Sequence, residues 1–289
     1  MSKLPIDLFR WVDSEADIHR RILRQGMHVV MNATTALDAS MPSMVMKVGV
    51  LMAVRYGSPR FTTDVDYSTT RRLQEIDHDK FVAMLGARLA DAPERRGYDL
   101  LCRIQRHAIK PPSPEASFPT VQVSVGLARI SVRREVERLN AGNAPRAISI
   151  DYSFNEWPAQ TEMIAVGDGA AIRAYDLTDL LAEKYRALLQ QEARNRARFQ
   201  DVYDIYHLLE LSDIAEHPDR SEVLRKLLLS SDGKIQKPSR LDLARPELVA
   251  RSRERYPELS NLVNDPPDFD VAYAKARAFF EALPWDETS

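Results

Sequence analysis

Asp64 and Asp66, two aspartates separated by one residue, are the side chains whose type and spacing point most directly to chemistry. They lie in the segment RYGSPRFTTDVDYS, whose β-branched and aromatic residues favour a strand. Residues i and i+2 of a strand point to the same face, so the two carboxylates would repel each other without a cation between them. Hard oxygen ligands favour Mg²⁺, or Mn²⁺ in its place. The competing interpretation is a solvated turn or an exposed strand face.

A third carboxylate lies in a later strand-like segment. The sequence AISIDYSF places Asp151 among apolar neighbours. In a mixed sheet this strand can lie beside the strand of Asp64, which would bring Asp151 to the same metal. The competing interpretation is an acid at the end of a strand, paired with Arg146 or another arginine.

A glycine turn precedes the two aspartates. The apolar run SMVMKVGVLMAVRYG predicts a short buried strand over residues 44–48, a turn at Gly49, and a helix that ends near Gly57. Such a turn lets the backbone N–H groups of Gly49 and Val50 approach a phosphate at the helix N-terminus. Most glycines of this kind only begin or end a helix, and that simpler interpretation stays open.

These features together are the parts needed for nucleotidyl transfer. Three acids would hold two divalent ions, which activate an attacking hydroxyl and hold the triphosphate and the leaving pyrophosphate. The acid nearest the nucleophile, Asp151, could assist its deprotonation. The order of strand, glycine turn, helix, D-x-D pair and third acid supports this hypothesis better than any one feature does.

Composition excludes several other classes of protein. The chain has 289 residues, of which 44% are hydrophobic and 28% are charged, as in an ordinary globular protein. Its net charge of −2 gives no overall basic field, so a polyanion site must be a local patch. We expect no membrane span, no secretory signal and no zinc site. The single cysteine, Cys102, excludes an internal disulfide and favours a cytoplasmic protein.

The elements that must position these acids form an α+β half followed by a helical half. The first forty residues and residues 74–92 are predicted to be helical. Over residues 98–154 the pattern of apolar residues changes to a period of two, which predicts three strands of one mixed sheet. After about residue 175 the pattern is almost wholly helical, so we expect one domain over 1–174 and a second over 175–289.

Two signatures in this order resemble those of a known family. The segment MKVGVLMAVRYGSPRFTTDVDYS is similar to the KGGTAL…YG…R.S.DIDF signature of the AbiEii/AbiGii-type nucleotidyltransferases, which belong to the DNA polymerase β-like superfamily. The segment LLAEKYRALLQQEARNRARFQDVYDIYHLL is similar to the family's second signature. The resemblance covers roughly residues 40–285. It implies a polymerase β-like nucleotidyltransferase core with a mixed sheet, followed by an all-helical C-terminal domain.

The resemblance also implies roles for particular residues. Asp64 and Asp66 would bind the metals, and Asp151 would complete the triad. Lys184 would contact the triphosphate of the nucleotide, because a compact ammonium suits phosphate charge. Asp201 would anchor or complete the pocket.

The second signature supplies further candidates. Asp204 would support Asp201 from the same helix. Three arginines before that helix could grip the triphosphate or an RNA backbone: Arg194, Arg196 and Arg198. The alternatives are a solvated turn for the arginines and a surface ion pair with Asp179 for Lys184.

The chain departs from the family pattern at the phosphate turn. The family's Gly-Gly-Thr becomes Val48-Gly49-Val50, so the hydroxyl that would bind a phosphate is absent. Gln200 also stands where an arginine usually precedes Asp201. Because the metal acids are present while the turn is altered, we expect a weaker, altered-donor or regulated transferase.

The implied function is a metal-dependent nucleotidyltransferase that moves NMP from an NTP to an acceptor, the tRNA 3′ end. It would act as the toxin of a toxin–antitoxin or phage-defence system, with a cognate antitoxin protein as partner. One alternative is synthesis of an oligonucleotide or second messenger in antiphage defence. Another is a catalytically degenerate module that only binds nucleotide or RNA, which the altered turn favours.

Overall fold

The chain folds into two compact units. The computed structural model describes residues 6–35, 44–113, 115–157, 160–166, 171–211 and 219–288. Unit 1 comprises Met1–Arg55 and Thr62–Ala174, and unit 2 comprises Tyr56–Phe61 and Tyr175–Ser289. The chain therefore leaves unit 1 for six residues, 56–61, before it returns to form the strand with the two aspartates.

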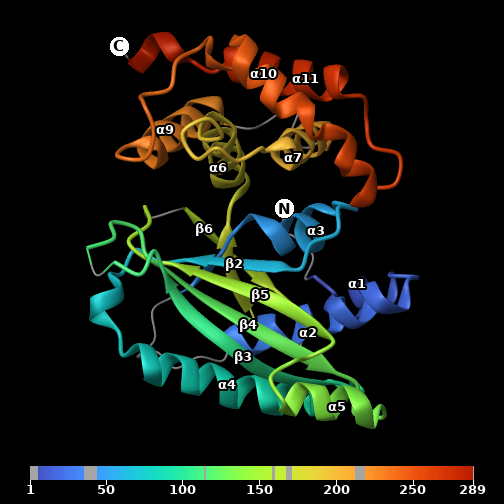
Figure 1. Ribbon diagram of the computed structural model, residues 1–289. Helices are drawn as coiled ribbons and strands as arrows, with labels where there is room; N and C mark the ends of the chain where they lie inside the picture. The colour runs from blue at the N-terminus through green and yellow to red at the C-terminus, as the bar shows by residue number, and fades with distance from the viewer. Residues whose placement is uncertain are drawn as a thin grey trace. The chain divides into compact units, whose positions relative to one another are not determined.

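One mixed sheet organises unit 1 (Figure 1). Over the described residues its order is β3-β4-β5-β2-β1-β7-β6. The strands are β1 (Val45–Met46), β2 (Asp64–Ser68), β3 (Leu101–Lys110), β4 (Thr120–Ala128), β5 (Arg146–Ser153), β6 (Thr161–Ala165) and β7 (Ala171–Tyr175). Strands β3, β4 and β5 form an antiparallel meander, and β2 pairs with β5 in parallel. The predicted mixed sheet is thus confirmed.

One face of this sheet is apolar because alternate residues of its strands are apolar. Val65, Ile150 and Val123 are buried on this face. The rings of Tyr67 and Tyr152 stack there with their centroids 5.2 Å apart. Each of these side chains contributes roughly 1.5–3 kcal/mol by burial. The alternation therefore fixes which residues of β2 and β5 face the opposite, polar side.

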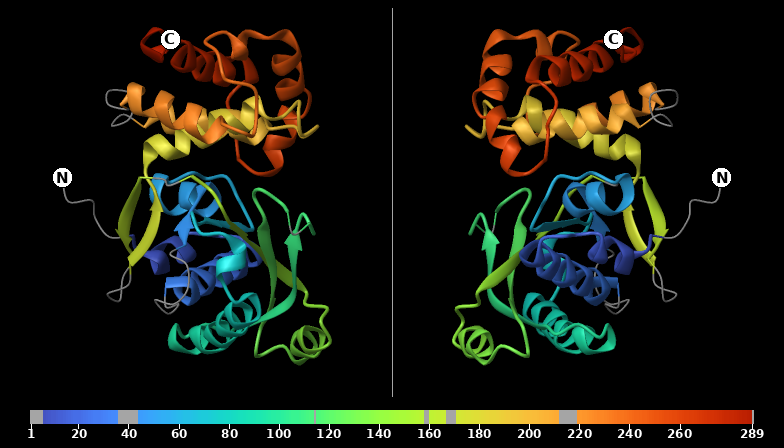
Figure 2. Two further views of the ribbon diagram at one scale, coloured as in Figure 1. Left: turned by 90° about the vertical axis from the view of Figure 1, so that its left-hand side faces the viewer. Right: turned by 90° about the vertical axis from the view of Figure 1, so that its right-hand side faces the viewer.

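Helices α2 and α4 pack on the apolar face, as Figure 2 shows. The helices of unit 1 are α1 (Leu8–Asp13), α2 (Ile18–Thr35), α3 (Val48–Tyr56), α4 (His78–Arg95) and α5 (Arg133–Asn140). Phe81 of α4 meets the ring of Tyr152 edge to face at 4.8 Å. The hydroxyl groups of Thr34 in α2 and Tyr67 in β2 are hydrogen-bonded at 2.8 Å.

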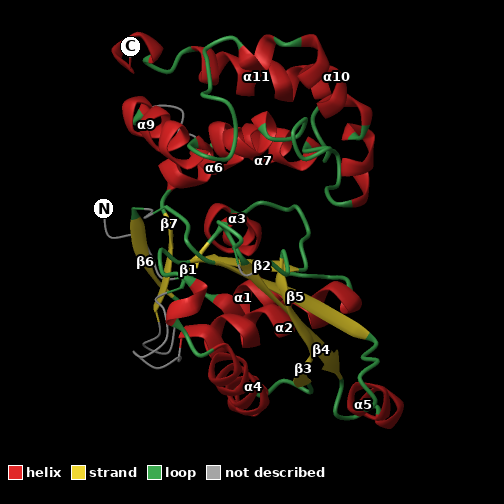
Figure 3. Cartoon of the chain, turned by 60° about the vertical axis from the view of Figure 1, so that its left-hand side comes forward, coloured by secondary structure: helices red, strands yellow, loops and turns green. Residues whose placement is uncertain are grey.

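Unit 2 is helical over its described residues beyond Tyr175, as predicted for the C-terminal region (Figure 3). Its α-helices are α6 (Leu177–Leu189), α7 (Phe199–Glu210), α9 (Arg220–Ser231), α10 (Pro246–Glu254) and α11 (Phe269–Glu281). Helix α6 packs against α7 and α9, and α7 packs against α11. Tyr185 of α6 is buried and donates a hydrogen bond to the carbonyl of Ala276, at 2.8 Å.

One local prediction needs correction. The first strand ends at Met46, and Gly49 lies inside the first turn of α3, because this helix begins at Val48. The predicted helical N-terminal region is confirmed over its described residues, where it consists of two helices, α1 and α2. Strands β6 and β7 were not predicted, because their segments TEMIA and AIRAY do not alternate strictly between polar and apolar residues. Among the described helices, none is both long and apolar enough to cross a membrane.

Candidate functional site

The three acids singled out in the sequence lie on one face of the sheet. In the parallel pairing of β2 with β5, Asp66 lies directly opposite Asp151 and Asp64 lies opposite Ser149. Asp64 is exposed, whereas Asp66 and Asp151 are half-buried. The face they share is the polar one, opposite the buried Val65 and Ile150. The predicted adjacency of the two strands is therefore confirmed.

A glutamine from β4 orients the third acid. Gln122 lies opposite Asp151 in the antiparallel pairing of β4 with β5. Its Nε2 donates to both carboxylate oxygens of Asp151, at 3.2 and 3.0 Å. Arg146, the alternative partner considered for Asp151, pairs instead with Glu135 at 3.1 Å. Sequence reasoning missed Gln122, although the alternation in TVQVSV places this residue on the polar face.

The start of α3 lies against the strand that carries the two aspartates. A Cβ atom added at Gly49 would lie 2.9 Å from the carbonyl oxygen of Asp64 and 3.3 Å from Oδ2 of Asp66. Glycine is therefore required here for close packing of helix on strand. The free N–H groups and the positive end of α3 lie beside the Asp66 carboxylate. Val50 is fully buried, so its side chain offers a ligand no contact.

The acids match a divalent cation in chemistry and in register. Carboxylate oxygens are the ligands that Mg²⁺ prefers, and neighbouring strands of a sheet lie about 5 Å apart. Over the part of the chain that the structure describes, no three His, Cys, Asp or Glu side chains converge as a ligand set. The backbone thus brings Asp66 and Asp151 together, and rotation of their side chains would have to complete a metal site.

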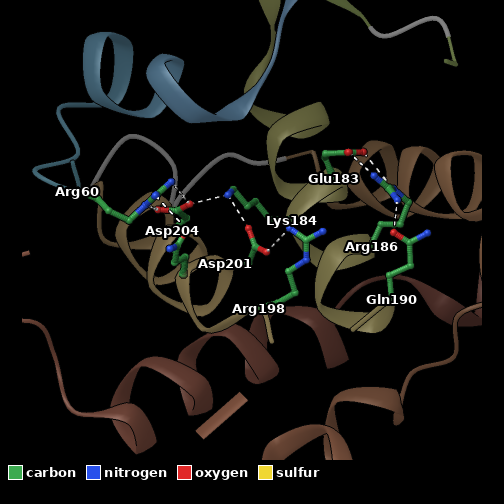
Figure 4. A network of polar contacts seen from close by, with 9 residues as sticks. Arg60, Glu183, Lys184, Arg186, Gln190, Arg198, Asp201 and Asp204 are labelled. Carbon is green, nitrogen blue, oxygen red and sulfur yellow. Dashed lines mark hydrogen bonds and ion pairs between the residues drawn. The ribbon is translucent and has the colours of Figure 1, made fainter. Parts of the chain in front are cut away.

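Lys184 and Asp201 lie in unit 2, in a buried network of ion pairs (Figure 4). Lys184 Nζ donates to Asp201 Oδ1 at 2.6 Å and to Asp204 Oδ2 at 2.5 Å. Arg60, from the six-residue segment of unit 2 that precedes β2, donates to both oxygens of Asp204 at 2.8 and 2.9 Å. Arg198 lies at the edge of the network, with Nη1 3.8 Å from Asp201 Oδ2.

The four buried side chains of the network are two cations and two anions. Burial alone would raise the pKa of Asp204, but Arg60 and Lys184 hold it below its ordinary value. Burial would likewise lower the pKa of Lys184, and the two aspartates raise it above its ordinary value instead. The ion pair with Asp179 proposed from the sequence is not formed, because Asp179 pairs with Lys226 at 2.5 Å.

Arg60 is the residue of this network that sequence reasoning assigned no role. Its partner Asp204 lies far along the chain, so no local spacing connects the two side chains. The one available signal is the arginine of the first signature, which matches position 60.

A family model agrees with both signatures. The model described as "Nucleotidyl transferase AbiEii toxin, Type IV TA system" matches residues 30–275. The match includes the three acids, the first turn of α3 and the network of unit 2. No curated protein matches the sequence.

Among the solved structures that match this chain, two illustrate the similarity in fold. MenT4, a nucleotidyltransferase toxin from Mycobacterium tuberculosis, aligns with a TM-score of 0.58 at 17% identity, covering 97% of this chain and 90% of its own. JHP933 from Helicobacter pylori aligns with a TM-score of 0.54 at 12% identity, covering 93% of both chains. At these identities the likeness concerns the fold alone.

Proposed function

The chain belongs to the AbiEii family of nucleotidyl transferase toxins of type IV toxin–antitoxin systems, and from this membership we propose its reaction and its substrates. The protein transfers a nucleoside monophosphate from an NTP to the 3′ hydroxyl of an RNA, with tRNA as the acceptor. The reaction depends on Mg²⁺ or Mn²⁺. A cognate antitoxin is the proposed protein partner, and the cytoplasm is the proposed compartment because NTP and tRNA are available there.

The observation that carries this proposal is the pairing of Asp66 with Asp151 beside the start of α3. Asp64, Asp66 and Asp151 would hold the divalent cation, which when bound activates the hydroxyl and neutralises phosphate charge. Asp151 accepts the proton of the attacking 3′ hydroxyl at a carboxylate oxygen. Gln122 keeps that carboxylate facing the polar side by its two hydrogen bonds.

The N-terminus of α3 binds the triphosphate in this proposal. The backbone N–H groups of Gly49 and Val50 have no partner within the helix and favour an anion. The 3′ oxygen forms a bond to the α-phosphorus while the bond from that phosphorus to the bridging oxygen breaks, and pyrophosphate leaves. Because neither Val48 nor Val50 offers a side-chain donor, backbone groups alone fill this role in the proposal.

Nucleotide binding by Lys184, Arg198 and Asp201 stays a proposal that rests on the second signature. The ammonium of Lys184 is shared between two carboxylates. A contact with phosphate therefore requires Lys184 to give up or share one of these partners. Arg198 needs no such exchange, because its distance of 3.8 Å from Asp201 leaves most of its donors available.

A second candidate function is nucleotide or RNA binding without transfer. The observation in its favour is the apolar first turn of α3, where Val48 and Val50 are both buried. In this case Asp66→Asn would leave nucleotide affinity unchanged, and pyrophosphate would not be released.

The deciding experiment incubates purified protein with Mg²⁺ and each α-³²P-labelled NTP, with and without total bacterial tRNA. Labelled tRNA, with no labelled product when tRNA is omitted, supports the proposed transfer and identifies the donor. Label in a small product without tRNA indicates synthesis of a second messenger in phage defence. Nucleotide binding with no product under any condition indicates the degenerate module.

A further inference from the structure

The polar face of the sheet extends from the catalytic acids to a free edge. Strand order places β4 and β5 between β2 and β3, and β3 is an edge strand. Three rows of register partners cross this face: Arg106, Ser124, Ser149 and Asp64; Ala108, Gln122, Asp151 and Asp66; Lys110, Thr120, Ser153 and Ser68. We call these three rows the polar face.

Two cations stand at the edge of the polar face. Arg106 and Lys110 are both exposed, and within the described residues neither side chain has a hydrogen bond or ion pair. Two other arginines of unit 1, Arg129 and Arg146, are engaged, since both pair with Glu135. The charges of Arg106 and Lys110 are therefore available to a ligand.

The residues between the cations and the acids suit a sugar–phosphate backbone better than a protein. They carry hydroxyl and amide groups, as in Ser124, Gln122 and Thr120, and no aromatic or large aliphatic side chain. Protein interfaces depend on buried aromatic or aliphatic anchors, whereas phosphates are contacted by Arg, Lys, Ser, Thr and Gln. Helices α2 and α4 lie on the other side of the green strands in Figure 2, so they leave this face uncovered.

We propose that the polar face binds the phosphate backbone of the RNA acceptor upstream of its reacting 3′ end, with Arg106 and Lys110 as the cationic contacts. This inference rests on the proposed transfer to RNA. Three strand spacings separate β3 from β2, about 14 Å, which leaves room for a few nucleotides between cations and acids. Arg106 and Lys110 are about 13 Å apart along the strand, so they contact different phosphates.

Such contacts bind RNA without regard to base and weaken with salt. The logarithm of affinity falls with the logarithm of salt concentration, and each lost phosphate contact makes this negative slope shallower by about 0.7 for a single strand. The double variant Arg106→Gln/Lys110→Gln should therefore make this slope shallower by about 1.4. It should raise the KM for tRNA about tenfold or more and leave the KM for NTP unchanged. The conservative variant Arg106→Lys/Lys110→Arg should retain activity near that of the wild type.

The matched control is Lys80→Gln/Arg88→Gln in α4, which removes one exposed lysine and one exposed arginine from the helix layer. It should behave like the wild type in every assay. Circular dichroism and the unfolding temperature show whether each variant is folded. A wild type that labels no RNA contradicts the proposed function itself, whereas a wild type that labels RNA allows the inference to be tested separately.

The inference is overturned if the glutamine double variant labels tRNA with the wild-type KM and salt slope. It is also overturned if the loss equals that of the α4 control, because the effect then reflects net charge. Poly-L-glutamate serves as a probe for an acidic protein partner. If the double variant loses affinity for this probe while its KM for tRNA is unchanged, the polar face binds an acidic protein instead.

Discussion

Asp66 and Asp151, far apart in the sequence, are direct partners in the parallel pairing of β2 with β5. Two carboxylates in such positions repel each other, and a fold gains nothing from this repulsion. Gln122 satisfies both oxygens of Asp151 with neutral donors and leaves its charge in place. The pairing of Asp66 with Asp151 therefore favours a role for these two carboxylates in binding a cation.

The first prediction concerns Asp151→Asn. We expect the rate of transfer to fall by roughly 10²–10³-fold or more, because one charge that stabilises the transition state is lost. The free energy of unfolding should change by less than about 1 kcal/mol, since the asparagine oxygen still accepts from Gln122 and the repulsion by Asp66 decreases. Chemical denaturation and initial rates measure the two effects. A variant that unfolds would indicate a structural carboxylate.

The second prediction compares two helical glycines. Alanine favours a helix over glycine by about 1 kcal/mol, so Gly86→Ala in α4 should be stabilising. Its Cβ would have ordinary contact, at 3.7 Å, with Ile104. Gly49→Ala should instead be destabilising by about 1–3 kcal/mol, because its Cβ would lie 2.9 Å from the Asp64 carbonyl oxygen. Equal effects of the two substitutions on the unfolding temperature would contradict the close packing of α3 on β2.

The third prediction concerns the buried network of unit 2. Lys184→Met should reduce the free energy of unfolding by about 3 kcal/mol, because it removes one of two cations from the buried Asp204. The control, Lys237→Met, removes an exposed lysine and should change stability by less than about 0.5 kcal/mol. Denaturant titrations measure both. A small effect for Lys184→Met, accompanied by lost nucleotide affinity, would mean that Lys184 binds nucleotide without stabilising the fold.

The fourth prediction is a pH dependence of stability. Hydrogen bonds from Arg129, helped by Arg146, lower the pKa of Glu135 to about 2 from its ordinary value of 4.5. Because the pKa is lower in the folded state, this contribution is present above pH 4.5 and is lost as pH falls towards 2. Glu135→Gln should therefore show a smaller loss of stability between pH 5 and 2 than the wild type. Parallel curves for the two proteins would exclude this ionic contribution.

Much of unit 1 is predictable from local pattern. The alternation in TVQVSV and AISIDYSF, like the i, i+2 spacing of Asp64 and Asp66, fixes which side chains share a face. The adjacency of β2 and β5 follows from the topological hypothesis that a third acid joins the pair, and the register confirms it.

The rest depends on tertiary contacts that leave no local signal. A lysine in an amphipathic helix is ordinarily exposed, so the burial of Lys184 requires knowing that α7 supplies two aspartates. The pairing of Arg60 with Asp204 joins residues with no common local pattern. Gly49 is predicted from the sequence to form a turn, and only the structure shows its close packing on β2 inside the first turn of α3.

The most direct test of the account is single-turnover transfer of label from the preferred α-³²P NTP to the 3′ end of tRNA. We predict transfer by the wild type with Mg²⁺, and loss of transfer with Asp66→Asn or with periodate-oxidised tRNA, which lacks the 3′ hydroxyl. Folding of Asp66→Asn is checked by its unfolding temperature. If folded Asp66→Asn transfers label at the wild-type rate, the pairing of Asp66 with Asp151 is not the catalytic centre.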